Sequence, residues 1–137
     1  MLIPTDFSEP AGEVLSFLKD IKGIDTVILL NVIDTRKNDP HFLEYRNVAK
    51  TKLGEIGDKL IQSGFHVENH VRTGYPPDEI ISLAETNSVT LIAMSPHGEG
   101  WLREVRELFV GSTTDAVVRR AGLPVIIIRG KRFKGNS

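Results

Sequence analysis

The stretch DTVILLNVI, residues 25–33, decides the fold that this sequence predicts. It is almost continuously apolar and rich in β-branched residues, a composition typical of a strand that is covered on both faces of a sheet. A strand buried in this way needs helices in the layers on either side of it. The rest of the chain is therefore expected to supply those helices.

The remaining sequence alternates strand patterns with helix patterns. Ser8 is a favourable helix N-cap, Pro10 suits a first helical turn and Gly23 is a stop signal, so a first helix is expected between them. Such alternation is typical of a parallel sheet, because each crossover must carry the chain back over the sheet. We expect a three-layer α/β sandwich with a five-stranded parallel sheet. The expected strands are residues 2–5, 25–33, 65–72, 89–94 and 122–128. The helices expected after the first one are residues 41–63, 78–85 and 113–120.

Length and composition indicate a single globular domain. The 137 residues are 40% hydrophobic and 26% charged, include no cysteine and carry a net charge of −1. The lack of cysteine excludes disulfides, thiolate metal sites and cysteine nucleophiles, and the balanced charge makes nucleic acid an unlikely partner. The apolar runs are far shorter than the ~20 residues of a membrane-spanning helix, and no secretory signal is recognisable. We expect a cytoplasmic domain over residues 1–130 and a basic, frayed tail over residues 131–137.

The first candidate binding residues follow the first strand. In open parallel sheets, ligands bind outside the carboxyl ends of the strands, where the strand order reverses. Asp6 stands in such a turn, after Pro4 and Thr5. Its carboxylate can accept hydrogen bonds from a base or a sugar, and it can equally accept them from backbone amides of the turn. The turn by itself favours neither role.

The second candidate region is SPHGEGWLREVRELFVGSTTD, residues 95–115, which follows the fourth strand. Gly98 lets the backbone approach a ligand closely, and Gly111, Ser112 and Thr113 stand where a helix is expected to begin. Amides at a helix N-terminus suit a phosphate because of their free donors and the helix dipole. The alternative is a glycine-serine turn that starts a helix and binds nothing. Neither the Gly-x-x-x-x-Gly-Lys-Ser/Thr phosphate loop nor the dinucleotide Gly-x-Gly-x-x-Gly fingerprint after a first strand is present.

Five stretches of the chain match the pattern of one known family in order. They are LIPTDFSEPA at 2–11, LLNVI at 29–33, Gly-Tyr-Pro at 74–76, Ser-Pro-His-Gly through Gly-Ser-Thr at 95–113, and PVIII at 124–128. On these stretches the chain resembles the universal stress protein family over residues 2–129. The resemblance implies a Rossmann-like fold of the adenine nucleotide alpha hydrolase type, with strand order 3-2-1-4-5. It also implies a homodimer, because an exposed apolar edge strand needs cover, in which the last strand pairs with its partner's copy through Val125, Ile126, Ile127 and Ile128.

The resemblance further implies an adenine-nucleotide site. The family's ATP-binding branch carries Gly-x2-Gly-x9-Gly-Ser/Thr after the fourth strand. Here Ser95 replaces the first glycine, and twelve residues, 99–110, stand where the motif has nine. Three additional residues are nearly one helical turn, which favours a longer capping helix or a lid. The implied nucleotide-binding residues are Pro4, Thr5, Asp6, Val32 and Met94 around the adenosine, and Ser95, His97, Gly98, Gly111, Ser112 and Thr113 around the phosphates. For His97, the favoured alternative is a side chain that braces the loop.

Catalytic and metal-binding signals are weak by comparison. No Gly-x-Ser-x-Gly elbow is present, and no lysine stands beside Gly111, so any ATP hydrolysis is expected to be slow. His66 and His70 fall on an expected strand, where four residues span about 13 Å, too far for one metal ion. Trp101 has apolar neighbours at helical spacing, which favours packing or a dimer contact.

The sequence therefore predicts an adenine-nucleotide-binding protein with a regulatory role in the stress response. The expected ligand is AMP or ATP, and Mg²⁺ is expected to accompany ATP. The alternative is a family member that binds no nucleotide and acts through dimerisation and protein partners.

Overall fold

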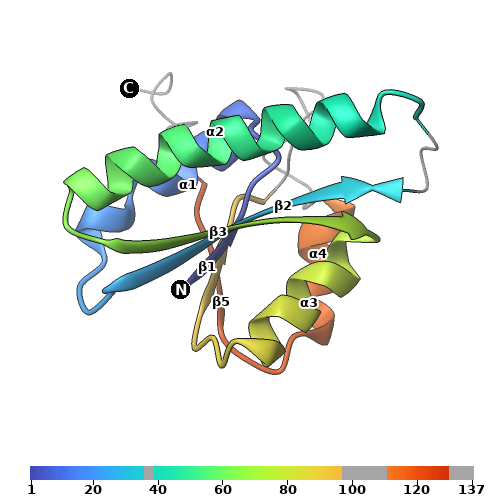
Figure 1. Cartoon of the computed structure of the whole chain (residues 1–137). Coiled ribbons are helices and arrows are strands. Elements are labelled where there is room, and N and C mark those ends of the chain that lie inside the picture. The colour runs from blue at the N-terminus through green and yellow to red at the C-terminus, as the bar shows by residue number, and fades with distance from the viewer. Residues whose placement is uncertain (36–38, 97–110, 130–137) are drawn as a thin grey trace, which may run out of the picture.

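The computed structural model describes residues 1–35, 39–96 and 111–129 and shows one parallel sheet between two helical layers (Figure 1). The strand order is β3-β2-β1-β4-β5, which confirms the order that the family resemblance implies. The expected tail at 131–137 lies outside the described residues. The strands are β1 (Leu2–Pro4), β2 (Thr26–Asp34), β3 (His66–Gly74), β4 (Ile92–Met94) and β5 (Val125–Ile127), and the helices are α1 (Glu9–Ser16), η1 (Leu18–Asp20, 3₁₀), α2 (Phe42–Gln62), α3 (Pro76–Thr86) and α4 (Ser112–Arg120).

Strand β2 is paired along both of its edges. On one side Ile28 and Leu30 stand opposite Leu2 and Pro4 of β1. On the other side the whole of β2 is paired with β3, from Thr26 to Asp34. The stretch that predicts a strand covered on both faces is therefore a long inner strand of the sheet.

Successive residues of β2 pack into opposite layers, as the strand period of two requires. Val27 and Leu29 belong to a core cluster with Leu53 of α2, whereas Ile28 and Leu30 belong to a second cluster with residues of α3 and α4. Figure 1 shows α1 and α2 over one face of the sheet and α3 and α4 over the other. Because both faces of β2 meet a core, its sequence shows an apolar run and not an alternation of polar and apolar residues.

The first helix ends earlier than the sequence predicts. Ser8 caps its start as expected, with its hydroxyl accepting a hydrogen bond from a first-turn amide at 3.3 Å. The α-helix stops at Ser16 and not near Gly23, and the 3₁₀ helix η1 follows it. Leu18 within η1 is nevertheless fully buried. The apolar spacing thus reflects core packing, which a tighter 3₁₀ turn satisfies as well as a continuous α-helix does.

Several other element ends also differ from the prediction. β3 runs to Gly74, and α3 begins at Pro76 and not at Asp78, because proline already has the φ angle of a first helical turn. β4 begins at Ile92 because the Val89 amide closes the end of α3, donating to a carbonyl of that helix at 3.0 Å. β5 begins only after Pro124, which has no amide to donate to a sheet.

The turn at Gly74 yields a test of the fold. Gly74 has φ 145°, and a Cβ placed there would lie 2.9 Å from Oε2 of Glu79. We expect Gly74→Ala to lower the free energy of unfolding by about 1–2 kcal/mol, because the new side chain is strained at positive φ and displaces Glu79. Urea unfolding measures the change.

Gly54→Ala is the matched control, because a Cβ at this helical glycine of α2 meets no atom within 4 Å. Alanine favours a helix over glycine by roughly 0.5–1 kcal/mol, so this variant should be at least as stable as the parent. Similar losses of stability in the two variants would contradict the role assigned to Gly74.

Candidate functional site

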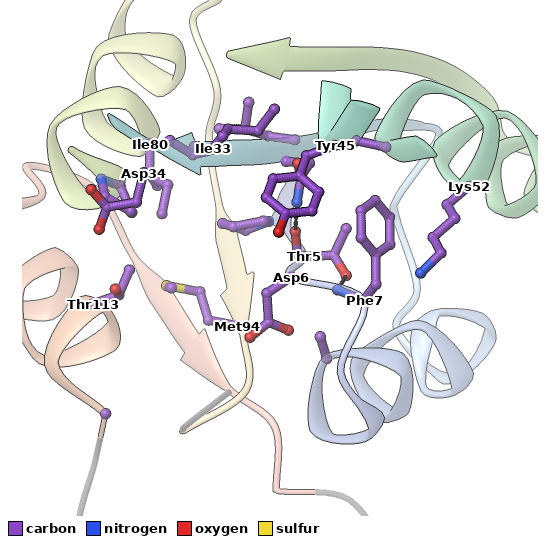
Figure 2. A pocket seen from close by; sticks show the side chains of 18 of the residues that line it. Thr5, Asp6, Phe7, Ile33, Asp34, Tyr45, Lys52, Ile80, Met94 and Thr113 are labelled. Atoms are coloured by element: carbon purple, nitrogen blue, oxygen red, sulfur yellow. Dashed lines mark hydrogen bonds between the residues drawn. The ribbon is translucent and has the colours of Figure 1, made fainter. Parts of the chain in front are cut away.

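A cavity of about 1040 Å³ lies at the carboxyl ends of β1, β2 and β4 (Figure 2). This is the edge of the sheet at which the α/β fold predicts a ligand. Two of the predicted nucleotide-binding residues, His97 and Gly98, lie outside the described residues. The cavity brings together the others, which are Pro4, Thr5, Asp6, Val32, Met94, Ser95, Gly111, Ser112 and Thr113.

The turn after β1 is shaped by side chains that bond to its own backbone. The Thr5 hydroxyl accepts a hydrogen bond from the Phe7 amide at 3.0 Å, and Oδ1 of Asp6 accepts one from the Ser8 amide at 2.9 Å. Phe7 is held at φ 65°, a region that costs a non-glycine residue roughly 1–2 kcal/mol and that is typical of functional sites. Asp6 therefore braces the turn while its carboxylate lines the cavity (Figure 2).

Asn31 is a cavity residue that the sequence prediction missed. Its side chain is buried, and its Nδ2 donates a hydrogen bond to the Thr5 carbonyl at 2.9 Å. This bond ties β2 to the turn after β1, and so it sets the position of Asp6 relative to Val32. The signal in the sequence was a polar residue inside an apolar strand, since a buried amide must find partners.

The N-terminus of α4 opens on the cavity without a side-chain cap. Gly111 occupies the N-cap position and has no side chain that could bond to the first amides of the helix. The first amides of a helix have no partner within the helix. Those of Ser112 and Thr113 therefore present donors, together with the positive end of the helix dipole, to an anion in the cavity.

A second missed residue, Thr114, holds α4 against the end of β4. Thr114 is 4% exposed, and its hydroxyl donates to the Ser95 carbonyl at 2.9 Å. The Gly111 amide donates to the Pro96 carbonyl beside it. These bonds position the first turn of α4 next to Met94 at the end of β4.

Charges of both signs line the described part of the cavity. The carboxylates are those of Asp6, Asp34 and Asp39, and the cation is Lys52, whose Nζ lies 5.2 Å from the centre of the Phe7 ring. A hydrogen bond of 3.0 Å from the Tyr45 hydroxyl to Asp39, together with the charge of that carboxylate, raises the pKa of Tyr45 above its ordinary value. The phenol thus stays neutral. Among the described lining residues, the start of α4 and Lys52 are the groups that favour an anion.

The described residues include no group of three histidine, cysteine or acidic side chains that could hold a metal ion. His66 and His70 both lie on β3, as predicted, and Nε2 of His70 lies 3.4 Å from a carboxylate oxygen of Glu68.

None of the described helices is long and apolar enough to cross a membrane.

The buried amide of Asn31 yields a second test. Asn31→Leu should lower the free energy of unfolding by about 1–3 kcal/mol, because the Thr5 carbonyl loses its partner inside the protein. Asn47→Leu, at an exposed position of α2, is the control and should change it by less than about 0.5 kcal/mol. Thermal unfolding compares the two. An unchanged stability in Asn31→Leu would mean that the bond does not hold the turn.

Known proteins resemble this chain along nearly its whole length. Residues 1–129 match the model of the universal stress protein family. Universal stress protein MJ0577 from Methanocaldococcus jannaschii is 33% identical in an alignment that covers 96% of this chain and 94% of that protein. The solved structure of MJ0577 has a TM-score of 0.82 with this chain at 36% identity, covering 95% of this chain and 94% of the other.

More distant members share the fold. Universal stress protein UspA from Lactobacillus plantarum has a TM-score of 0.79 at 23% identity, covering 93% of this chain and 95% of its own. The universal stress protein from Archaeoglobus fulgidus in complex with dAMP has a TM-score of 0.67 at 21% identity, with coverage of 93% and 95%. With its sheet order and its match over residues 1–129, the chain belongs to the universal stress protein family.

Proposed function

We propose that this protein binds an adenine nucleotide, AMP or ATP, in the cavity at the carboxyl ends of β1, β2 and β4, and acts as a regulatory protein of the stress response. The observation that carries the proposal is the meeting of Asp6, Val32 and the N-terminus of α4, with glycine at its N-cap, in one cavity. The dAMP complex of the Archaeoglobus fulgidus family member supports an adenine nucleotide as the ligand.

The two ends of the nucleotide would meet different chemistry. Asp6 and the backbone of Val32 offer acceptors and donors to the adenine, and Pro4 and Met94 supply apolar contact. Backbone groups distinguish bases by their hydrogen-bonding pattern, so this site needs no pair of stacked aromatic rings.

The phosphates would lie at the start of α4. Amides of Ser112 and Thr113 and the helix dipole favour negative charge there, and Thr114 holds that turn in place. His97 and Gly98 are assigned to the phosphates by their place in the sequence motif alone.

The proposed role is binding and not rapid turnover. Figure 2 shows Lys52, the cation of the described lining, on the other side of Asp6 from Thr113, so it is not placed to neutralise a phosphate at α4. Fast phosphoryl transfer needs positioned cations at the transferred group. Any ATP hydrolysis would accordingly be slow.

A second candidate function is action through a homodimer and protein partners without a nucleotide. It is favoured by β5, an edge strand of the sheet on which Ile126 remains 36% exposed. Apolar edge strands are usually covered, and pairing with the β5 of a second copy would cover this one through Val125, Ile127 and Ile128 as well. The dimer is compatible with both candidate functions.

Nucleotide content is the direct test. We expect the purified protein to release material absorbing at 260 nm on denaturation, and the nucleotide-free protein to bind AMP or ATP saturably in calorimetric titration at one site per chain. The mass of the native protein is measured by analytical ultracentrifugation in the same preparation. A dimer with no saturable nucleotide binding would reject the proposal in favour of the second candidate function.

The orientation of the nucleotide is tested by two substitutions. Asp6→Asn should weaken adenosine, AMP and ATP alike, by about tenfold, because a charge-assisted hydrogen bond to the base is lost while the bond to the Ser8 amide can remain. Gly111→Val should weaken AMP and ATP but spare adenosine, because the side chain obstructs the approach of the phosphates to α4. Calorimetry with the three ligands measures these ratios.

Gly111 has φ −63° and ψ 155°, angles open to valine, so backbone strain would not explain a loss of binding. Gly122→Val, outside the cavity and with no atom within 4 Å of the added Cβ, serves as the matched control and should bind all three ligands normally. Equal losses for adenosine and ATP in Gly111→Val would show that the phosphates do not lie at α4.

A further inference from the structure

Part of the cavity lining lies on the side of α2 (Figure 2). This α2 annex is formed by Phe7, Ala11, Tyr45, Val48, Ala49 and Lys52, from the turn after β1 and from α1 and α2. In Figure 2, Phe7 and Lys52 lie on one side of Asp6, and Thr113 and Asp34 lie on the other. The contacts proposed for the nucleotide leave the annex unused. The whole cavity, about 1040 Å³, is at the upper end of the roughly 300–1,000 Å³ of ordinary small-molecule sites.

The annex presents apolar surface to water. Ala11 and Ala49 of its lining are buried, while Tyr45 is 47% exposed and Val48 is 50% exposed. Exposed apolar side chains grouped at the mouth of a cavity are typical of ligand-binding surfaces. A ring or another flat apolar group would bury Val48 together with the face of Phe7.

The annex contains Lys52, the cation of the described lining. The other charged groups of that lining are the carboxylates of Asp6, Asp34 and Asp39, and Asp39 accepts a hydrogen bond from Tyr45 of the annex. Lys52 forms no ion pair with a described residue. Its ammonium lies over the Phe7 ring, where an anion can still approach it from the solvent side. Within the annex, Lys52 is therefore the group that attracts the negative charge of a ligand.

The backbone that carries the Phe7 ring is held in place before any ligand arrives. Phe7 stays at φ 65° because the Thr5 hydroxyl and the Asp6 carboxylate bond to the amides of the same turn. A wall that is already ordered loses little conformational entropy on binding. An aromatic ring with an attached anion is the chemistry that matches this wall and the cation beside it.

We propose that the α2 annex binds a small aromatic anion, a ring that bears a sulfonate, carboxylate or phosphate group. The ring lies against Phe7 and Val48, and the anionic group lies at Lys52. The ligand binds beside the nucleotide site and does not replace the nucleotide. The proposal does not depend on nucleotide binding, because none of the annex residues is assigned to the nucleotide.

The probe for the test is 8-anilinonaphthalene-1-sulfonate, an aromatic sulfonate whose fluorescence rises when its rings leave water. We expect saturable binding at one site per folded chain. Lys52→Gln should weaken binding about fivefold, the value of an exposed charge contact of about 1 kcal/mol. Val48→Glu should weaken it more, by about tenfold, because apolar contact is lost and a negative charge faces the sulfonate.

Each variant has a control on the same helix. Lys50→Gln removes an exposed lysine of α2, and Ile61→Glu adds a charge at a residue of α2 that is 54% exposed; neither residue lines the cavity. Both controls should bind the probe as the parent does. Circular dichroism confirms that all four variants are folded, which is expected because the substituted side chains are exposed.

Three outcomes would overturn the proposal. The first is equal probe binding by Lys52→Gln and Lys50→Gln, and the second is equal losses in Val48→Glu and Ile61→Glu. The third is complete displacement of the probe by saturating AMP, which would place the ring in the nucleotide site. A protein that binds the probe with the expected variant pattern but does not bind AMP would support the annex and reject only the proposed function.

Discussion

The burial of β2 on both of its faces is the constraint on which the rest of the structure depends. Val27 and Leu29 enter one core, and Ile28 and Leu30 enter the other. A shift of one residue in the pairing would exchange these two sets between differently shaped cores, so the register is strongly specified. The carboxyl ends of β1 and β2 are fixed relative to each other as a result.

The candidate site begins where this apolar run ends. Asn31 is buried at the cavity end of the run, and its side chain donates a hydrogen bond to the Thr5 carbonyl. Because β2 is held in register, this bond also fixes the position of the turn that carries Asp6. At the end of β4, the Thr114 hydroxyl fixes the position of α4 in the same way, by donating a hydrogen bond to the Ser95 carbonyl. Two buried polar side chains thus connect a hydrophobic scaffold to the groups that would meet a ligand.

Groups of opposite charge line different parts of the cavity, and this distribution limits where an anionic ligand can bind. The carboxylates of Asp6, Asp34 and Asp39 repel an anion near them, while the N-terminal end of α4 and the ammonium of Lys52 attract one. Figure 2 shows Thr113 of α4 and Lys52 on opposite sides of Asp6. The proposed phosphate site and the proposed annex are therefore separate attractive regions of one cavity.

The order of the elements and most of the candidate site could be predicted from the sequence, because they depend on local patterns. The apolar run of β2, the Ser8 cap and the short motifs after β1 and β4 are contiguous in the chain and carry their own signal. The ends of α1 and α3 could not be placed correctly in this way. Leu18 packs into the core from a 3₁₀ turn, and Pro76 starts a helix without a polar cap.

Sequence alone determined the α/β class, the family resemblance and the candidate binding residues in the motifs that follow β1 and β4. Only the tertiary structure decided that Asn31 bonds to Thr5, and that Lys52 of α2 lies over Phe7 at the mouth of the same cavity. The physical reason is separation along the chain. A side chain's partner across a sheet or between layers is set by register and helix packing, which no local pattern of residues encodes.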